Sequence, residues 1–443
     1  MSGVVAVFDA GKTNKKLLLF DEEYKVIHET SQRFEEVADE DGFPCENVES
    51  LQSWIHSELT RLLAAGQFTP TAINFTSYGA SFVHLDENGK VILPLYNYLK
   101  PYPAQLASTF FNKYGGENNL SRETASPILG HLNSGLLLYR LKHEKQLLNN
   151  KGFSLHLPQY LSFLLTGKYY SDITSIGCHT MLWHFEKYRY HDWAMREGID
   201  QRLAPVFSSD EVMDVEFNDA RFLVGVGLHD SSAALIPYLA SFHEPFVLIS
   251  TGTWSISMNP FNHSPLTAAE LKQDCLCYMT YQQKPVKSSR LFAGHMHDSA
   301  VNKIAAQFNR NNNFYEEIKY DENCVEQLKS RFKFSEDDLD VYTSCEDAYH
   351  ALMIDIVRKQ AESTNLVMSA DVKKIFVDGG FGRNEIYMRL LADAFPLLEV
   401  YAASVPQATA MGAALAIHKH WNRREVPEGI VNVKRQTSDG RRE

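Results

Sequence analysis

Short apolar runs that end in polar, glycine-containing turns recur along the chain. Residues 4–8 are apolar, residues 9–14 (Asp-Ala-Gly-Lys-Thr-Asn) are polar, and residues 17–20 are apolar again. This order predicts a β-hairpin. The same order returns at residues 246–258, where residues 251–253 (Thr-Gly-Thr) form the turn. The repeated hairpin indicates an internal duplication in which each half opens on a hairpin.

Between and after the hairpins, the spacing of apolar residues predicts further elements. Residues 50–63 have the spacing of an amphipathic helix, and residues 101–220 are mostly helical in pattern. The other predicted elements are strands at 72–75, 82–85, 91–95 and 375–377, and helices at 134–141, 159–165, 385–395 and 408–416. Strands that alternate with helices favour an α/β fold. We predict two lobes, residues 1–243 and 244–443.

Composition and charge exclude several classes of protein. The chain has 443 residues and a formal net charge of −12, so nucleic acid, which requires a basic surface, is not an expected partner. No apolar run approaches the length of about 18 residues that a membrane span needs, and the N-terminus lacks the features of a signal peptide. Six scattered cysteines are not a disulfide framework, which favours a cytoplasmic protein. The last dozen residues are expected to be mobile.

Three polar turns that contain glycine follow predicted strands, at residues 9–14, 251–253 and 378–384. Glycine lets a backbone approach closely, so the amides of such turns can face phosphate oxygens. None of the three has the spacing of a P-loop or of a dinucleotide-binding fingerprint. Each one alone is explained better as an ordinary hairpin or helix-entry turn. Their number, and the acids near them, favour phosphate binding.

Two aspartates are placed where chemistry could use them. Asp9 ends a strand at the first turn, where it could form hydrogen bonds with its own turn. It could instead hold Mg²⁺ beside phosphates, with Lys12 and Lys16 adding positive charge. Asp230 lies between a glycine-rich strand end and an alanine-rich helix, either as an N-cap or as a general base kept ionised by the helix dipole. The neighbouring His229 is as well placed for packing as for catalysis.

Taken together, these segments resemble the FGGY family of carbohydrate kinases, in the actin and sugar-kinase superfamily. The similar segments are the first phosphate motif at 9–16, the sugar-side loop at 78–89, the Leu-Thr-Gly segment at 165–169, the catalytic-base segment at 227–234, the second phosphate motif at 250–254 and the adenosine motif at 378–384. Each motif is short, but they follow one another in the family's order over nearly the whole chain.

The resemblance implies phosphorylation of a sugar hydroxyl, with ATP and Mg²⁺ as cofactors. It implies two actin-like (ribonuclease H-like) lobes with a cleft between them, the first for sugar and the second for nucleotide. Asp230 would be the general base, and Asp9 would hold the magnesium ion. The implied phosphate and nucleoside contacts are Gly11, Lys12, Thr13, Asn14, Lys16, Thr251, Gly252, Thr253, Gly379, Gly380 and Asn384. The implied sugar contacts are Gly79, Ala80, Asn97, His229 and Asp230.

The details favour one subgroup but also depart from the family's pattern. The His-Asp pair at 229–230 and Gly-Thr-Trp at 252–254 look more like the rhamnulose and fuculose kinases, which suggests a ketose or deoxy-ketose substrate. Lys12 stands where a hydroxyl is common, and Gln407 stands where many members have glutamate. Residues 96–98 (Tyr-Asn-Tyr) stand where many members have a carboxylate, and a charged acceptor contributes strongly to sugar specificity. The sugar is therefore left open, as is the oligomeric state, a homodimer included.

Other hypotheses compete with an active kinase. A degenerate kinase that binds sugar or nucleotide as a regulator is favoured by the change at 96–98 but disfavoured by the presence of Asp9 and Asp230. A chaperone-like or filament-forming ATPase of the same superfamily would lack the sugar-facing base segment. Residues 294–298 (Gly-His-Met-His-Asp) could bind a transition metal, although no pattern in the sequence fixes their geometry.

Overall fold

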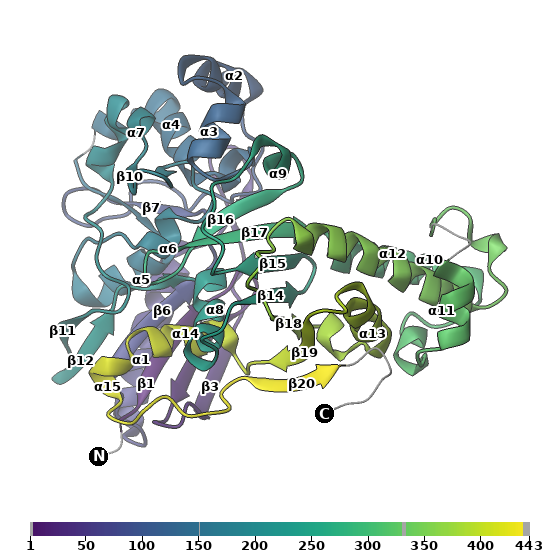
Figure 1. Ribbon diagram of the computed structural model, residues 1–443. Coiled ribbons are helices and arrows are strands. Elements are labelled where there is room, and N and C mark those ends of the chain that lie inside the picture. The colour runs from purple at the N-terminus through teal and green to yellow at the C-terminus, as the bar shows by residue number, and fades with distance from the viewer. Residues whose placement is uncertain (1–2, 150, 330–333, 437–443) are drawn as a thin grey trace.

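The computed structural model describes residues 3–149, 151–329 and 334–436 (Figure 1). They form two lobes, each built on a seven-stranded sheet with helices packed against it. The predicted division at residue 243 falls between α8 (Asp230–Ser241) and β14 (Phe246–Thr251), where the chain passes from the first sheet to the second. The predicted α/β fold with two lobes is confirmed.

The first sheet has the strand order β11-β12-β6-β1-β2-β3, and β13 also pairs with β6. Its strands are β1 (Val5–Ala10), β2 (Lys15–Phe20), β3 (Val26–Gln32), β6 (Ala72–Ser77), β11 (Val212–Phe217), β12 (Ala220–Gly225) and β13 (Leu228–His229). The central strands β1 and β6 are buried almost throughout, because layers of helices and loops cover both faces of the sheet. This burial explains the nearly continuous apolar run of β1.

The second sheet has the strand order β16-β17-β15-β14-β18-β19-β20. Its strands besides β14 are β15 (Ser255–Asn259), β16 (Cys275–Met279), β17 (Pro285–Leu291), β18 (Lys374–Gly379), β19 (Glu399–Ser404) and β20 (Asn432–Gln436). At its centre β14 is antiparallel to β15 and parallel to β18, just as β1 is antiparallel to β2 and parallel to β6. Both predicted hairpins are present, and their equivalent places in the two sheets support the internal duplication.

The helices begin and end where local signals allow. In α1 (Val48–Ala65), Asn47 accepts the N–H of Ser50 at the start, and Gly66 ends the helix with a left-handed φ of 63°. The other α-helices are α2 (Ala104–Lys113), α3 (Glu117–Glu123), α4 (Ser134–Lys145), α5 (Leu157–Thr166), α6 (Ile173–Ile176), α7 (Asp192–Arg196), α9 (Ala268–Lys272), α10 (Ala293–Gln307), α11 (Glu322–Lys329), α12 (Cys345–Asn365), α13 (Glu385–Ala394), α14 (Ala408–Ala416) and α15 (His418–Trp421). Within the described residues, no helix has both the length and the apolar character needed to cross a bilayer.

Helices α8 and α14 cross between the lobes (Figure 1). α14 lies on β1 and β6 of the first sheet, although it follows the strands of the second sheet along the chain. α8 extends the other way: the Tyr238 hydroxyl donates a hydrogen bond to Asp378 (2.7 Å), and its ring packs against Phe376. The two helices approach closely because small residues face each other, and a Cβ atom at Gly412 would lie 1.8 Å from the carbonyl oxygen of Ala233. This crossing brings the beginnings of both helices to the lobe boundary.

Residues 91–95, predicted as a strand, do not form one. Strand β7 (Phe82–His84) pairs instead with β8 (Ser154–His156), and only an isolated bridge between Leu85 and Val91 remains of the predicted hairpin. Pro94 has no N–H with which to continue a ladder. The sequence did not reveal β8, so the true partner of β7 could not be predicted locally.

Other strands were missed or misjudged. The stretch predicted as mostly helical includes strand β11, which pairs with β12 just beyond it, and a two-stranded ladder of β9 (Trp183–His184) and β10 (Arg189–Tyr190). Another ladder joins β4 (Val37–Ala38) and β5 (Pro44–Cys45). The last dozen residues were expected to be mobile, but residues 432–436 form the edge strand β20; residues 437–443 lie outside the described part of the chain.

Candidate functional site

Asp9 lies at the end of β1, where the first hairpin meets the beginning of α14. The Thr409 hydroxyl donates a hydrogen bond to Asp9 Oδ2 (2.7 Å). Burial raises the pKa of Asp9 to about 6, and the charge of Asp230 adds to the rise, while the Thr409 hydrogen bond and Lys16 oppose it. The two aspartates that the sequence singled out are therefore brought close enough for the charge of Asp230 to affect the ionisation of Asp9. Thr409 itself had no signal in the sequence, because it lies at the other end of the chain.

The first hairpin carries three lysines with different surroundings. Lys12 lies 2.8 Å from Glu36 and Lys16 lies 3.0 Å from Glu29, and each keeps about a quarter of its side chain exposed (27% and 26%). Such pairs near the surface are weak, so both ammonium groups can turn toward a phosphate. Lys15 is buried and forms an ion pair with buried Glu46 instead.

The turn of this hairpin is tight. A Cβ atom at Gly11 would lie 3.1 Å from the carbonyl oxygen of Asn14. The Asn14 side chain accepts a hydrogen bond from Arg33 (2.9 Å), while Thr13 is exposed. Among the predicted phosphate contacts in this turn, the side chain of Asn14 thus has a structural partner already, and Thr13 is free at the surface.

Asp230 is the first residue of α8. Its Oδ1 accepts the N–H of Ser231 (2.6 Å), and the positive end of the helix dipole favours its ionised form. Burial at the lobe boundary acts more strongly in the other direction and raises its pKa to about 6. The side chain still has 32% of its surface exposed. Asp230 is thus a partly accessible carboxylate that changes charge near neutral pH.

His229 lies in a close-fitting environment beside Asp230. Its Nε2 is 3.1 Å from Asp230 Oδ1 and 3.1 Å from Cys178 Sγ, and Tyr278 of the second sheet stacks on its ring at 5.7 Å. Burial lowers the pKa of His229 to about 3, so its imidazole is neutral. A Cβ atom at Gly79 would lie 2.8 Å from the His229 ring, so only glycine fits there. The predicted sugar contacts Gly79 and His229 are brought together with Asp230.

Two other predicted sugar contacts differ in their exposure and bonding. Ala80 is buried and has a left-handed φ of 64°, so its backbone shapes the loop next to Gly79. Asn97 is buried, and both ends of its amide are used: it donates to the carbonyl of Pro44 (3.0 Å) and accepts the N–H of Leu99 (3.0 Å). Its amide thus helps to hold a loop, and its contact with the substrate stays a prediction.

A pocket of about 540 Å³ lies in the second lobe beside the turn between β14 and β15. Its lining includes the predicted nucleotide contacts Thr251, Gly252, Thr253, Gly380 and Asn384. Lys319 and Arg383, which the sequence did not single out, also line it and supply positive charge. The predicted contact Gly379 is not part of the lining. It instead lets two strands approach, since its φ is 96° and a Cβ atom there would lie 1.9 Å from the Thr251 carbonyl oxygen.

Several side chains in this lining are used to shape it. The Thr251 hydroxyl donates to the carbonyl of Asp378 (2.7 Å) and accepts the N–H of Phe381 (3.1 Å). Asn384 accepts the N–H of Tyr387, which caps α13, and donates to the Tyr349 hydroxyl (2.7 Å). The side chains of Thr251 and Asn384 therefore form most of their hydrogen bonds within the protein. A ligand could still contact the backbone of the turn, Thr253 and the two cationic side chains, Lys319 and Arg383.

Residues 294–298 form the first turns of α10 at the edge of this pocket. Gly294 lies against the phosphate turn, since a Cβ atom there would be 2.0 Å from the Gly252 carbonyl oxygen. His297 is buried and lies 3.2 Å from the Tyr349 hydroxyl and 3.2 Å from Asp298. Across the described ranges, no group of three or more His, Cys, Asp or Glu side chains is arranged to hold a metal ion. The segment therefore has a place in the pocket wall rather than in a transition-metal centre.

Comparison with known families agrees with this division of the chain. The model of the N-terminal domain of the FGGY family of carbohydrate kinases matches residues 4–235. Two models of the FGGY C-terminal domain match residues 243–323 and 335–418. The chain therefore belongs to the FGGY family of carbohydrate kinases.

Individual relatives are more distant. A rhamnulokinase from Oceanobacillus iheyensis is 23% identical over 382 residues, which cover 78% of this chain and 77% of that protein. A rhamnulokinase from Halalkalibacterium halodurans is 26% identical over 258 residues, or 56% of this chain and 52% of that protein. The family membership and these relatives make the chain a carbohydrate kinase, which confirms the predicted class of enzyme.

Solved structures share the fold over nearly the whole chain. A carbohydrate kinase from Novosphingobium aromaticivorans has a TM-score of 0.79 at 21% identity and covers 98% of this chain and 94% of its own. A ligand-bound xylulose kinase from Lactobacillus acidophilus has a TM-score of 0.75 at 13% identity, with 97% and 92% covered. At these identities the likeness extends to the fold alone.

Proposed function

We propose that the chain transfers the γ-phosphoryl group of ATP to a hydroxyl of a ketose or deoxy-ketose, with Asp230 as the general base. The observation that carries this proposal is the position of Asp230 at the start of α8, close to Asp9 and partly accessible, with a pKa of about 6. A base works best when its pKa lies near the working pH. The rhamnulokinase names of the sequence relatives support a ketose with a deoxygenated end.

In the proposed reaction, ionised Asp230 accepts the proton of the sugar hydroxyl while that oxygen bonds to the γ-phosphorus. The bond between the γ-phosphorus and the bridging oxygen breaks, and ADP leaves. Gly79 and His229 would lie against the sugar, since His229 contacts Asp230 and Gly79 packs against the His229 ring. Neutral His229 can hydrogen-bond a sugar oxygen without adding a charge next to the base.

The nucleotide is proposed to lie in the second-lobe pocket, with its phosphates directed toward the first hairpin. Lys12 and Lys16 on one side, and Gly252 and Thr253 on the other, would then surround the phosphates. Phosphoryl transfer depends mostly on such positioning and charge compensation. Closure of the lobes around the substrates would exclude water, which would otherwise accept the phosphoryl group.

The residues present fit a magnesium ion held together with the nucleotide. Asp9 and Asp230 are carboxylates whose pKa values are both raised, and the charge of Asp230 contributes to the rise at Asp9. A divalent cation beside them would relieve this repulsion, and oxygen donors are what Mg²⁺ prefers. When bound there, the ion would neutralise charge that develops on the phosphates. Asp9 is the proposed protein ligand, with phosphates and water completing the shell.

The second candidate function is that of a catalytically degenerate sugar- or nucleotide-binding regulator. One observation favours it: the 96–98 segment offers Tyr98 where many family members have a carboxylate. The presence of Asp9 and Asp230 in one site argues against it, because a regulator needs neither.

A coupled assay of ADP release with Mg²⁺, ATP and a panel of ketoses, deoxy-ketoses and polyols tests the proposal. We expect sugar-dependent ADP release, and in Asp230→Asn a fall in turnover of at least about 100-fold with ATP binding intact. Asp337→Asn is the matched control, because it makes the same change on an exposed carboxylate that does not line the pocket, and it should retain activity. Sugar or nucleotide binding without turnover in the unaltered protein would support the regulator instead.

A further inference from the structure

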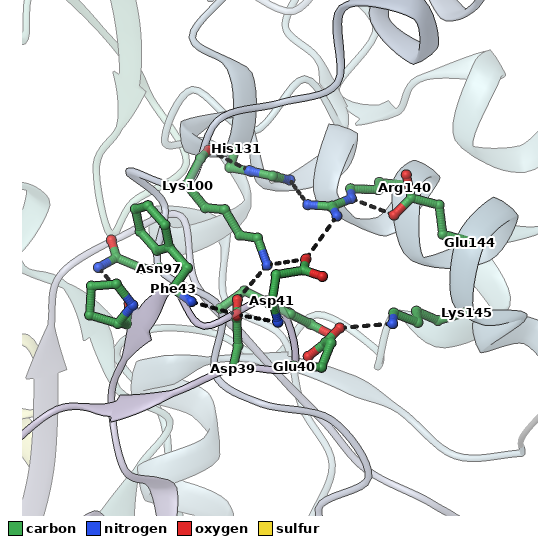
Figure 2. Close-up of polar contacts among 12 residues, drawn as sticks. Asp39, Glu40, Asp41, Phe43, Asn97, Lys100, His131, Arg140, Glu144 and Lys145 are labelled. Atoms are coloured by element: carbon green, nitrogen blue, oxygen red, sulfur yellow. Dashed lines mark hydrogen bonds and ion pairs between the residues drawn. The ribbon is translucent and has the colours of Figure 1, made fainter.

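The segment from residue 96 to residue 100 is tied to an acidic loop of the first lobe. Figure 2 shows Lys100 between two carboxylates of that loop, Asp39 at 2.5 Å and Asp41 at 2.6 Å. Lys100 and Asp39 are buried, with 6% and 0% of their side chains exposed. Behind them, His131 contacts the Lys100 carbonyl (2.6 Å) and Arg140 contacts His131 (3.3 Å). This ion-pair cluster, which we call the Lys100 clamp, fixes one end of the segment.

The other end of the segment is fixed by the same loop. The Tyr96 hydroxyl donates to Glu40 (2.6 Å), which also pairs with Lys145 of α4 (3.0 Å). The Asn97 amide donates to the carbonyl of Pro44 (3.0 Å). Anchors on both sides leave the residue between them, Tyr98, little freedom to move.

Tyr98 packs beside the end of β6, next to the proposed sugar site. Its ring lies 5.9 Å from the ring of Tyr78, which directly precedes Gly79 at the end of β6. The ring is partly buried, and no described residue forms a hydrogen bond with its hydroxyl. Burial raises the pKa of Tyr98, and the charges of Asp230 and Glu46 raise it further. A tyrosine held rigidly near the base with an unused hydroxyl is suited to contact a substrate.

We propose that Tyr98 contacts the sugar and helps to determine its specificity, and that the Lys100 clamp positions Tyr98 for this contact. This inference rests on the proposed kinase function and adds a residue to its sugar site. Tyr98 presents an aromatic face for C–H groups and one neutral hydroxyl for one sugar oxygen. A neutral phenol binds a single hydroxyl less strongly than a carboxylate does, but it leaves no buried charge unpaired when the substrate lacks that hydroxyl. Such a residue suits a partly deoxygenated sugar.

The first test compares Tyr98→Phe with the unaltered enzyme on the best ketose and on a set of its single-deoxy analogues. We expect kcat/KM to fall by about 3- to 10-fold on the parent sugar, the usual contribution of one hydrogen bond between neutral groups. The loss should disappear for the one analogue that lacks the contacted hydroxyl. The KM for ATP should not change. Tyr102→Phe is the matched control, because its hydroxyl donates to the backbone of Leu136 and is not directed at this site.

The second test examines the clamp. Lys100→Met and the milder Asp41→Asn should each raise the KM for sugar while leaving the KM for ATP unchanged, and Lys100→Arg should restore part of the loss. Lys187→Met is the control, because it removes an exposed cation of the same lobe that pairs with Asp192, away from the Lys100 clamp. Asp41→Asn keeps the Lys100–Asp39 pair, so it should fold even if Lys100→Met does not.

The outcomes separate this inference from the function on which it rests. An active enzyme whose Tyr98→Phe variant has unchanged kcat/KM on every sugar would reject the contact and leave the kinase function standing. A Tyr98 effect with no effect of Asp41→Asn or Lys100→Met would reject the positioning role alone. Absence of sugar binding, measured by calorimetry, together with absence of sugar-dependent ADP release would reject both.

Discussion

The two hairpins at the lobe boundary share a backbone but not a charge pattern. Strands β1 and β14 each have six residues, and each is paired in the same way with an antiparallel and a parallel neighbour. Asp9 and Ser250 are the fifth residues of these strands. Equivalent backbone positions therefore carry a carboxylate in one lobe and a small hydroxyl in the other.

The neighbouring strands extend the contrast. In the β1–β2 ladder, Lys15 lies opposite Ala10 and Lys16 lies opposite Asp9. Ser255 and Ile256 occupy the equivalent positions on β15. The first hairpin thus contains one acid and several lysines, and the second contains no charged residue in its turn. The two lobes therefore contain turns with similar backbones but different side chains, and we propose different roles for them. In the proposed function the first hairpin would compensate the charge of the phosphates, and the second would form an uncharged side of the nucleotide site.

The largest expected effect is on stability, at the buried lysine of the charged hairpin. Lys15→Met leaves Glu46 buried without its cation, so we expect the free energy of unfolding to fall by about 3–5 kcal/mol. Lys25→Met, which breaks the exposed pair with Glu23, should cost less than about 1 kcal/mol. Chemical denaturation of the two variants measures the difference. Equal, small losses would mean that the charge at position 15 has no structural role.

The next effect concerns catalysis and compares Asp9 with Ser250, the fifth residues of β1 and β14. Asp9→Asn should lower turnover by at least about 100-fold and raise the Mg²⁺ concentration needed for activity, because a metal ligand is lost. Ser250→Ala removes the equivalent side chain of the second hairpin and should change turnover by no more than about twofold. Steady-state rates across a magnesium titration provide the measurement. Similar losses in both variants would contradict the division of work between the hairpins.

The smallest effect concerns Gly379 at the end of β18, which packs against the second hairpin. Gly379→Ala forces a side chain onto a φ of 96° and against the Thr251 carbonyl oxygen, so we expect about 1–3 kcal/mol of destabilisation. Gly380→Ala is the control, because nothing lies within 4 Å of a Cβ atom there. Thermal unfolding with and without ATP would show whether the strained variant also binds nucleotide more weakly. Indistinguishable unfolding of the two variants would show that the end of β18 tolerates a side chain at position 379.

Local patterns predicted the hairpins and the helix of residues 408–416, since apolar runs, polar turns and small residues are signals a few residues long. They also singled out Asp9, Asp230 and the three glycine-containing turns as candidate functional residues. They could not predict contacts between distant segments. Thr409 reaches Asp9, and Tyr278 reaches His229, only because the lobes fold against each other.

The same limit applies to the residues of the proposed sugar site. Asn97 has the polarity of a sugar ligand, but its amide is used by the loop at Pro44. Its neighbour Tyr98 has the free hydroxyl. Which of two adjacent side chains faces a site depends on the strand or loop against which the segment packs. That partner, residues 39–46, lies about 50 residues earlier in the chain and carries no motif.

The role of Asp230 is tested most directly by single-turnover phosphoryl transfer from MgATP to the best sugar, measured against pH. Because the pKa of Asp230 is raised to about 6, the base becomes protonated as the pH falls through that value, whereas an ordinary aspartate would stay ionised to about pH 4. We predict that the rate falls by at least about tenfold per unit below pH 6, since Asp9, whose pKa is also raised to about 6, must be ionised as well, and that Asp230→Asn is at least about 100-fold slower at pH 8. A rate that stays constant from pH 8 to pH 5, or an Asp230→Asn variant as fast as the unaltered enzyme, would contradict the assignment of Asp230 as the base.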